Sequence, residues 1–183
     1  MLKKTLSLIF FILFMAGGVV QAQVSITYSS QGKQHFTMTI PDSWRVNVGV
    51  ADDPAQKQED GRLHERLITA IPSDGTALWF GMWVPTDVKN FEEAEEYIDS
   101  LGLELLTDVV TKERKFDTLN GMEVYYTSGT GKKEGESMDF HSAFVQLSQE
   151  NVAIAIYIGP HETTVTHGAE LTQMFHSLQQ VKQ

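Results

Sequence analysis

Alternation of apolar and polar residues recurs through much of the sequence and leaves few folds open to it. From His35 to Ile40 an apolar side chain stands at every second position. Such a pattern is typical of a strand with one face on a core and the other toward water. Further strands are predicted over 24–29, 63–71, 77–84, 103–111, 114–119, 122–127, 138–148 and 152–158, and extended structure resumes at Trp44 after Pro41.

Short turns separate most of these predicted strands. Asn120-Gly121 is the strongest hairpin signal, because both central residues of a type I′ turn need positive φ. Pro72-Ser73-Asp74-Gly75 has the composition of a β-turn. The polar segment 51–61 and the glycine- and lysine-containing segment 129–137 are predicted loops. Strands joined in this way pair antiparallel, so the sheet is expected to be mainly antiparallel.

Two segments change from strand to helix periodicity. Apolar residues recur at helical spacing from Asn90 to Leu101, with Asn90 as the expected N-cap and Gly102 as the residue that ends the helix. A last helix is predicted over 168–181. The apolar faces of these helices need a surface to cover, and the sheet is the only candidate. The sequence therefore predicts an α+β fold, a mainly antiparallel β-sheet packed by amphipathic helices, as a single domain over 23–183.

The first residues are typical of a secretory signal peptide. Lys3 and Lys4 precede an apolar run from Leu6 to Met15, and a small residue follows at Ala22. An uncleaved anchor helix is the alternative, but the apolar stretch is shorter than the roughly 20 residues that a membrane span prefers. We therefore expect residues 1–22 to be a signal peptide cleaved after Ala22, and the mature chain to be periplasmic or secreted.

Charge and cysteine content exclude several classes of function. The chain has 14 Lys and Arg against 24 Asp and Glu, a net charge of −10, and loss of two leader lysines would make it −12. An acidic protein without a basic stripe is not expected to bind nucleic acid or an anionic membrane surface. The absence of cysteine excludes disulfides, thiolate metal sites and a lipid anchor on cysteine. No later segment is apolar enough to cross a bilayer, and no cofactor is predicted.

The histidines give no metal-binding or catalytic motif. Metal ligands often recur two residues apart on a strand or four apart on a helix, and no pair here has that spacing. The nucleophile and zinc patterns G-x-S-x-G and H-E-x-x-H are also absent. No catalytic or metal-ligating residue is therefore predicted. One alternative stays open: His35, His64 and His141 could meet across neighbouring strands, or a serine and a histidine could converge, in a small metal- or Ser/His-dependent hydrolase.

Four aromatic residues are the candidates for binding a ligand or partner: Trp79, Trp83, Tyr125 and Tyr157. If the predicted strand phases hold, some of them share a sheet face and line an apolar pocket or partner groove. The alternative is that a helix covers that face and makes them ordinary core.

Two motifs resemble a known family. The strand from Phe36 runs into a Pro-x-x-Trp corner at Pro41 to Trp44, and His176-Ser177-Leu178 closes an amphipathic helix after a long hairpin. Together they resemble the PsbP/DcrB/Mog-type family of small α/β/α sandwich domains. The resemblance implies a mostly non-catalytic accessory, assembly or binding module. Many exported relatives are lipoproteins, from which this cysteine-free chain departs, and no site residue of the family carries over.

Three functional hypotheses follow. The first is an exported, non-enzymatic binding or assembly module of the bacterial envelope, whose partner is a protein or an envelope component. The second is the small hydrolase described above. The third is a carrier of a small apolar ligand, which requires a cavity between sheet and helix lined by Trp79 or Trp83.

Overall fold

The computed structural model describes residues 22–49 and 66–182, together with the backbone but not the side chains of 102–104. Residues 1–21 of the predicted signal peptide, the predicted loop 51–61 and His64 lie outside these residues. The strands are β1 (Gln23–Ser30), β2 (Lys33–Pro41), β3 (Trp44–Val48), β4 (Ile68–Pro72), β5 (Trp79–Trp83), β6 (Thr107–Leu119), β7 (Met122–Lys133), β8 (Glu136–Ser148), β9 (Asn151–Gly159) and β10 (Gln179–Gln180). The helices are α1 (Phe91–Leu105), α2 (His161–Thr166) and α3 (Gly168–His176).

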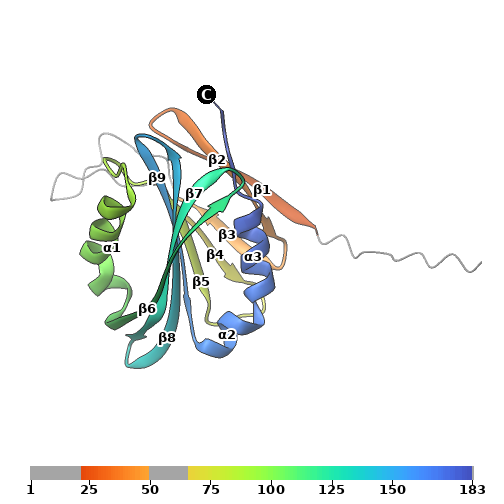
Figure 1. Cartoon of the computed structure of the whole chain (residues 1–183). Coiled ribbons are helices and arrows are strands. Elements are labelled where there is room, and N and C mark those ends of the chain that lie inside the picture. Colours follow the sequence, from red (N-terminus) through yellow and green to blue (C-terminus); the bar gives the residue numbers. More distant parts are fainter. Residues whose placement is uncertain (1–21, 50–65, 183) are drawn as a thin grey trace, which may run out of the picture.

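The described strands form two sheets where one was predicted, and both are antiparallel, as the short turns predict. The larger has the order β3-β4-β5-β9-β8-β7-β6 and the smaller the order β1-β2-β10. Helix α1 lies on one face of the large sheet, and α2, α3 and the small sheet cover the other (Figure 1). Because β5 is central and β6 is at the edge, α1 carries the chain across the sheet face between them. Below, these faces are called the α1 face and the α3 face.

The main core lies on the α3 face, between the large sheet and its two-part cover. Phe36, Phe80 and Met174 come from the small sheet, the large sheet and α3, and all are fully buried. Tyr28 stacks on Phe36 with ring centroids 4.9 Å apart, while its hydroxyl accepts a hydrogen bond from the Val84 N–H at 3.2 Å. Interdigitated side chains of this size supply most of the apolar area that stabilises a domain.

A polar clasp on Glu170, made by Ser43, Trp44 and His167, ties α3 to the Pro-x-x-Trp corner. The Ser43 hydroxyl donates to Glu170 Oε1 at 2.8 Å, and the Trp44 indole N–H donates to Oε2 at 2.9 Å. His167 Nδ1 lies 2.7 Å from the same Oε2. Burial raises the pKa of Glu170, but the hydrogen bonds from His167, Trp44 and Ser43 together outweigh it and hold this pKa below its usual range. The corner is therefore a structural anchor.

The chain after α3 differs from its prediction. The predicted helix 168–181 ends at His176, and the chain continues into β10 beside β2. The Ser177 hydroxyl accepts a hydrogen bond from the Thr39 N–H at 2.8 Å and donates to the Met174 carbonyl at 2.6 Å. These bonds cap the helix and direct the chain to the open edge of β2. Helix α2, which begins directly after Pro160, was not predicted.

The predicted loop 129–137 is also wrong, because β7 and β8 extend through it to a tight turn at Glu134 and Gly135. Gly129 is there for space, since a Cβ would lie 2.1 Å from the Val110 carbonyl oxygen. Gly102 lies inside α1 and does not end it. The predicted strands 103–111 and 114–119 are one strand, β6, and the gap between them corresponds to a register shift between Thr111 and Glu113.

Across the described segments, no helix is both long enough and apolar enough to cross a membrane.

Candidate functional site: a cleft beneath α1

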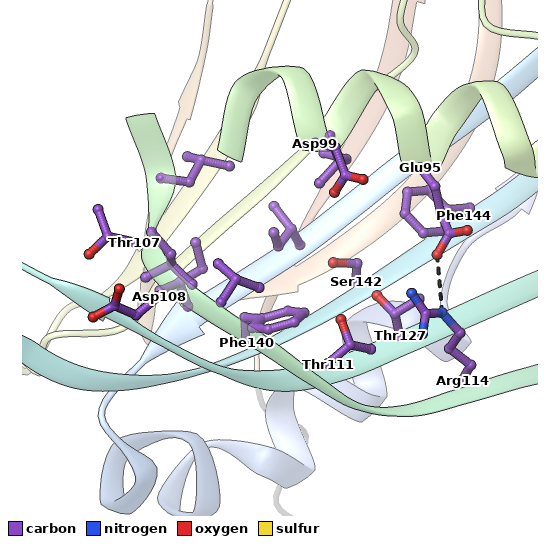
Figure 2. Close-up of a pocket in the computed structure, with 16 residues that line it drawn as sticks. Glu95, Asp99, Thr107, Asp108, Thr111, Arg114, Thr127, Phe140, Ser142 and Phe144 are labelled. Atoms are coloured by element: carbon purple, nitrogen blue, oxygen red, sulfur yellow. Dashed lines mark hydrogen bonds and ion pairs between the residues drawn. The ribbon is translucent and has the colours of Figure 1, made fainter. Parts of the chain in front are cut away.

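A cleft of about 360 Å³ opens between α1 and the end of the large sheet that carries β6 (Figure 2). Its floor is apolar and is made by alternate residues of the central strands β8 and β9: Phe140, Phe144, Ile156 and Ile158. Ile98, Leu105 and Leu106 form the wall on the α1 side. The volume lies in the range of small-ligand sites, which are mostly apolar with a few placed polar groups.

The curvature of β6 keeps this part of the face open. β6 shifts register against β7 between Thr107 and Val110 and again between Thr111 and Glu113. Bulges bend a strand and increase its local twist. Gly131 lets the chain that leaves α1 approach closely, because a Cβ there would lie 3.1 Å from the Leu106 side chain. The chain that leaves α1 therefore packs closely on β7, and Leu106 lines the cleft at this contact.

Hydroxyl groups interrupt the apolar floor. Thr127 and Ser142 are buried with relative exposures of 8% and 3%, and both line the cleft together with Thr111 (Figure 2). Within the segments that the structure describes, the hydroxyl groups of these two residues form no hydrogen bond, and neither oxygen is fully enclosed, so both open onto the cleft. A hydroxyl group can both donate and accept a hydrogen bond. These hydroxyls are therefore suited to bind a polar group of an occupant.

Charged groups stand around the rim. Arg114 Nε lies 3.4 Å from Glu95 Oε1, and the Tyr125 hydroxyl donates to the same oxygen at 3.0 Å (Figure 2 shows the Arg114 pair). Burial and then the neighbouring Glu95 raise the pKa of Tyr125. Asp99 and Asp108 add two further carboxylates to the lining. Because acidic groups outnumber Arg114, the rim favours a neutral or basic occupant over an anionic one.

The four predicted aromatic residues divide between the two faces. Trp83 is buried under α1, with its ring 6.4 Å from that of Tyr97. Tyr125 is on the same face and reaches the cleft rim through Glu95. Tyr157 is on the α3 face, stacked on His141 with ring centroids 4.6 Å apart. Burial raises the pKa of Tyr157 to about 12.

Trp79 lies on the α1 face and lines a second groove of about 750 Å³. Its ring lies over Gly81, where a Cβ would come 2.2 Å from a ring carbon. Leu105 and Ile158 line both this groove and the cleft, so the two hollows flank the C-terminal end of α1. Of the predicted residues on this face, Trp79 lines the groove, whereas neither Trp83 nor Tyr125 lines the groove or the cleft.

The two described histidines of the hypothetical metal site, His35 and His141, do not meet. His35 lies in the small sheet and His141 in the large one. Among the described residues, no group of three His, Asp or Glu could hold a metal ion. His35 Nε2 lies 2.9 Å from the Ser30 hydroxyl, but within the described segments it has no carboxylate partner to orient it as in a triad. Burial lowers the pKa of His35.

A second hydroxyl–histidine contact occurs beside the Glu170 clasp. His167 Nε2 lies 3.1 Å from the Thr76 hydroxyl, with Glu170 on its other nitrogen. Thr76, however, donates its proton to Asp74 Oδ1 at 2.8 Å. A nucleophile must give that proton to the base, so this arrangement holds the chain in place and does not activate Thr76.

Sequence reasoning missed the cleft residues. The available signal was Ser142 between Phe140 and Phe144, a small polar side chain on an otherwise apolar strand face. Thr127 faces it from the neighbouring strand β7, where it is the Cα partner of Ser142. Neither residue forms a motif by itself, and only the pairing of β7 with β8 brings them together.

No family model matches the chain, and no curated protein matches it in sequence. Among solved structures it is similar to the PsbP protein CyanoP of Synechocystis sp. PCC 6803, with a TM-score of 0.59 at 7% identity over 90% of this chain and 96% of that one. A protein from Bacteroides thetaiotaomicron VPI-5482 gives a TM-score of 0.53 at 12% identity over 89% of this chain, which spans only half, 50%, of the Bacteroides chain.

LpqN of Mycobacterium tuberculosis, a protein involved in cell envelope biogenesis, gives a TM-score of 0.49 at 11% identity over 88% of this chain and 91% of that one. At such identities the two matches above this score bear on architecture alone. They agree with the two antiparallel sheets and the helices on both faces described above. The expected resemblance is confirmed at that level: the chain has the α+β sandwich fold of PsbP.

Proposed function

We propose that this chain is an exported, non-enzymatic binding module of the bacterial envelope, and that the cleft beneath α1 holds an apolar segment of a partner protein. The observation that carries the proposal is the pair of hydroxyl groups of Thr127 and Ser142, which have no hydrogen-bond partner in the described segments and open onto the cleft beside its apolar floor. A site of this kind gains from an occupant that covers the floor and satisfies the hydroxyls.

The charges of the rim limit the chemical classes of occupant that the cleft favours. Asp99 and Glu95 stand on α1 above the floor, and Arg114 is already paired with Glu95. The carboxylates of Glu95 and Asp99 would repel an anionic head group. They would not repel an apolar side chain followed by a neutral or basic residue. A peptide segment also carries the amide groups that can pair with the Thr127 and Ser142 hydroxyls.

Export is supported by the sequence of residues 1–22 and requires its own test. Full-length protein is expressed in a bacterial host, the periplasmic fraction is collected, and the N-terminus of the recovered chain is sequenced. We expect the periplasmic chain to begin at Gln23. A chain that stays in the cytoplasm with its leader intact would contradict the localisation without bearing on the cleft.

The cleft is tested by blocking it from within. Ser142→Leu fills the floor with an apolar side chain, and Ser25→Leu makes the same change at an exposed position of β1. Each protein is immobilised and exposed to envelope extract, and captured proteins are identified by mass spectrometry. We expect a partner that binds wild type and Ser25→Leu but not Ser142→Leu. Capture that is equal on all three proteins would rule out the cleft as the binding site.

Carriage of a small apolar ligand is the second candidate, because the cavity it requires does lie between helix and sheet. Trp83 does not line that cavity, and Trp79 lines only the neighbouring groove. A neutral fluorescent naphthylamine dye tests it directly. Saturable dye binding that Ser142→Leu abolishes, together with no cleft-dependent protein partner, would favour the carrier over the binding module.

A further inference from the structure

Strand β6 forms one edge of the large sheet, with β7 as its single neighbour within the described residues (Figure 1). Twelve of its 13 residues are exposed or half-buried. Phe116 is the extreme case, since 71% of this large apolar residue is exposed. A long edge strand presents unpaired N–H and C=O groups that can pair with another chain, and natural proteins usually block such edges.

The two halves of β6 differ in how well they are blocked. Both register shifts fall in the first half, between Thr107 and Glu113. From Glu113 to Leu119 the pairing with β7 is regular. Bulges twist an edge away from a partner, whereas a regular stretch leaves it competent to accept another strand. Phe116 is the central residue of this regular stretch.

We propose that Glu113–Leu119 pairs antiparallel with the same stretch of a second copy, about a two-fold axis that passes beside Phe116. In this register Lys115 of each copy stands opposite Asp117 of the other, and the two Phe116 side chains stand opposite each other. Arg114 is opposite Thr118. Opposite charges and aromatic pairs directly across two strands are the contacts that stabilise such pairing.

The electrostatics of the stretch suit self-association. The stretch holds two acidic residues, Glu113 and Asp117, and two basic ones, Arg114 and Lys115, so its formal charge is zero in a chain of net charge −10. Lys115 and Asp117 already form an ion pair at 2.6 Å on one side of the strand. Two copies in the proposed register extend that pair into a four-member network of alternating sign.

Phe116 supplies the apolar part of the contact. Its inner side stacks on Tyr125 with ring centroids 4.6 Å apart, and Phe91 of α1 lies 6.1 Å away. The ring is therefore held in place while its outer side remains exposed. Pairing that covers both rings removes this apolar area from water at little further ordering of the side chain.

Two-fold pairing is also self-limiting. The same patch is used on both subunits, so the contact closes after two copies and leaves no β6 edge for a third. Antiparallel pairing about an axis perpendicular to the sheet keeps both α1 helices on the same face. The two clefts would then open side by side, each with Arg114 next to Thr118 of the other copy.

A charge swap tests the register in solution. Sedimentation velocity of wild-type protein at increasing concentration is expected to show a monomer–dimer equilibrium. Lys115→Asp places carboxylates opposite one another twice, and we expect the dissociation constant to rise about tenfold or more. The double variant Lys115→Asp/Asp117→Lys restores both pairs and should dimerise like wild type. A wild-type protein that stays monomeric at every concentration would overturn the proposal.

Introduced cysteines test the geometry, because the chain has none of its own. Directly opposed residues have Cα atoms about 4.5–5.5 Å apart, within the roughly 4.4–6.8 Å that a disulfide spans. Phe116→Cys should therefore cross-link to itself under mild oxidation. Thr118→Cys should not, because its two copies are offset by four residues, about 13 Å along the strands. A mixture of Thr118→Cys and Arg114→Cys should form the mixed dimer.

Val165→Cys, on α2 and 66% exposed at this position in the native chain, measures cross-linking by random collision. Phe116→Cys that cross-links no faster than Val165→Cys would overturn the proposed axis. Efficient self-cross-linking of Thr118→Cys would place the axis elsewhere on the strand and would likewise contradict the register. Because every cysteine site is exposed, failure to fold does not confound the comparison.

Discussion

The two faces of the large sheet are built from the same strands but are covered differently. On the α3 face, two helices and a second sheet enclose a core in which Phe80 and Met174 are fully buried. On the α1 face, helix α1 crosses the sheet and leaves a cleft with an apolar floor. Under the proposed function, the α3 face mainly stabilises the domain and the α1 face binds a partner.

Two neighbouring residues of β8, Ser142 and Ala143, lie on opposite faces of the large sheet and show the difference between these faces within one strand. Ala143 is fully buried on the α3 face, where it lines a hollow of about 230 Å³ beside α3, while Ser142 lies in the floor of the cleft. Side chains alternate along a strand, so one strand serves both purposes at once. Polar groups follow the same division: the Glu170 clasp is satisfied, whereas the hydroxyl groups of the cleft floor have no partner in the described segments.

Truncation of a core aromatic should give the largest difference between the faces. Phe80→Ala removes a ring packed edge-to-face on Phe175 at 6.1 Å, and we expect a loss of about 3–5 kcal/mol in the free energy of unfolding. Phe116→Ala, at the exposed edge of β6, should cost less than about 1 kcal/mol in dilute solution. Urea denaturation measures both. Equal losses would mean that the α1 side is as tightly packed as the core.

Loss of the clasp carboxylate should be the next largest effect. Glu170→Gln should cost about 1–3 kcal/mol at neutral pH, because hydrogen bonds to a charged group are removed. Since the folded pKa of Glu170 lies below its usual value, its contribution is present above the unfolded pKa of about 4.3 and is lost as pH falls through the folded pKa. Unfolding curves of both proteins from neutral to acidic pH check this.

Glu162→Gln, at an exposed position of α2, is the control for that series and should leave stability nearly unchanged. The stability gap between wild type and Glu170→Gln should close under acid. If the gap stayed constant as the pH fell, the carboxylate of Glu170 would not be charged in the clasp at neutral pH.

Larger side chains at two adjacent positions of β8 compare how much room each face of the large sheet has. Ala143→Leu adds volume at a fully buried position between β8 and α3 and should cost about 1–3 kcal/mol. Ser142→Leu adds volume to the open floor and should cost less, while it removes binding of the naphthylamine dye or partner. Chemical denaturation and dye titration of the two variants test this together. A greater loss of stability for Ser142→Leu would show that the floor has no room.

Removal of the rim cation should have the smallest effect on stability. Arg114→Met breaks an exposed ion pair with Glu95, and such pairs contribute about 0–1 kcal/mol. Any difference should shrink in high salt, because exposed charges are screened. Thermal unfolding at low and high ionic strength measures it. A larger, salt-insensitive loss would mean that Arg114 packs on the cleft wall and is part of its structure.

The sequence by itself determined the local elements. Alternation from His35 to Ile40 gave β2, and Asn120-Gly121 gave a hairpin with φ of 51° and 84°. Asn90 caps α1, since its side-chain oxygen accepts a hydrogen bond from the Glu93 N–H at 2.9 Å. Each of these depends on residues a few positions apart, and backbone sterics and side-chain period act over that range. The antiparallel α+β class followed from their order.

Only the tertiary structure decided which side chains share a surface. Trp79 and Tyr157 were predicted together, yet β5 pairs with β9 in a register that puts Trp79 opposite Ile158 and Tyr157 on the other face. The cleft required Thr127 and Ser142 to meet across β7 and β8, and β10 required the free edge of β2. A period of two fixes which residues of one strand share a face, but not toward which layer that face turns. That choice belongs to contacts between segments far apart in the chain.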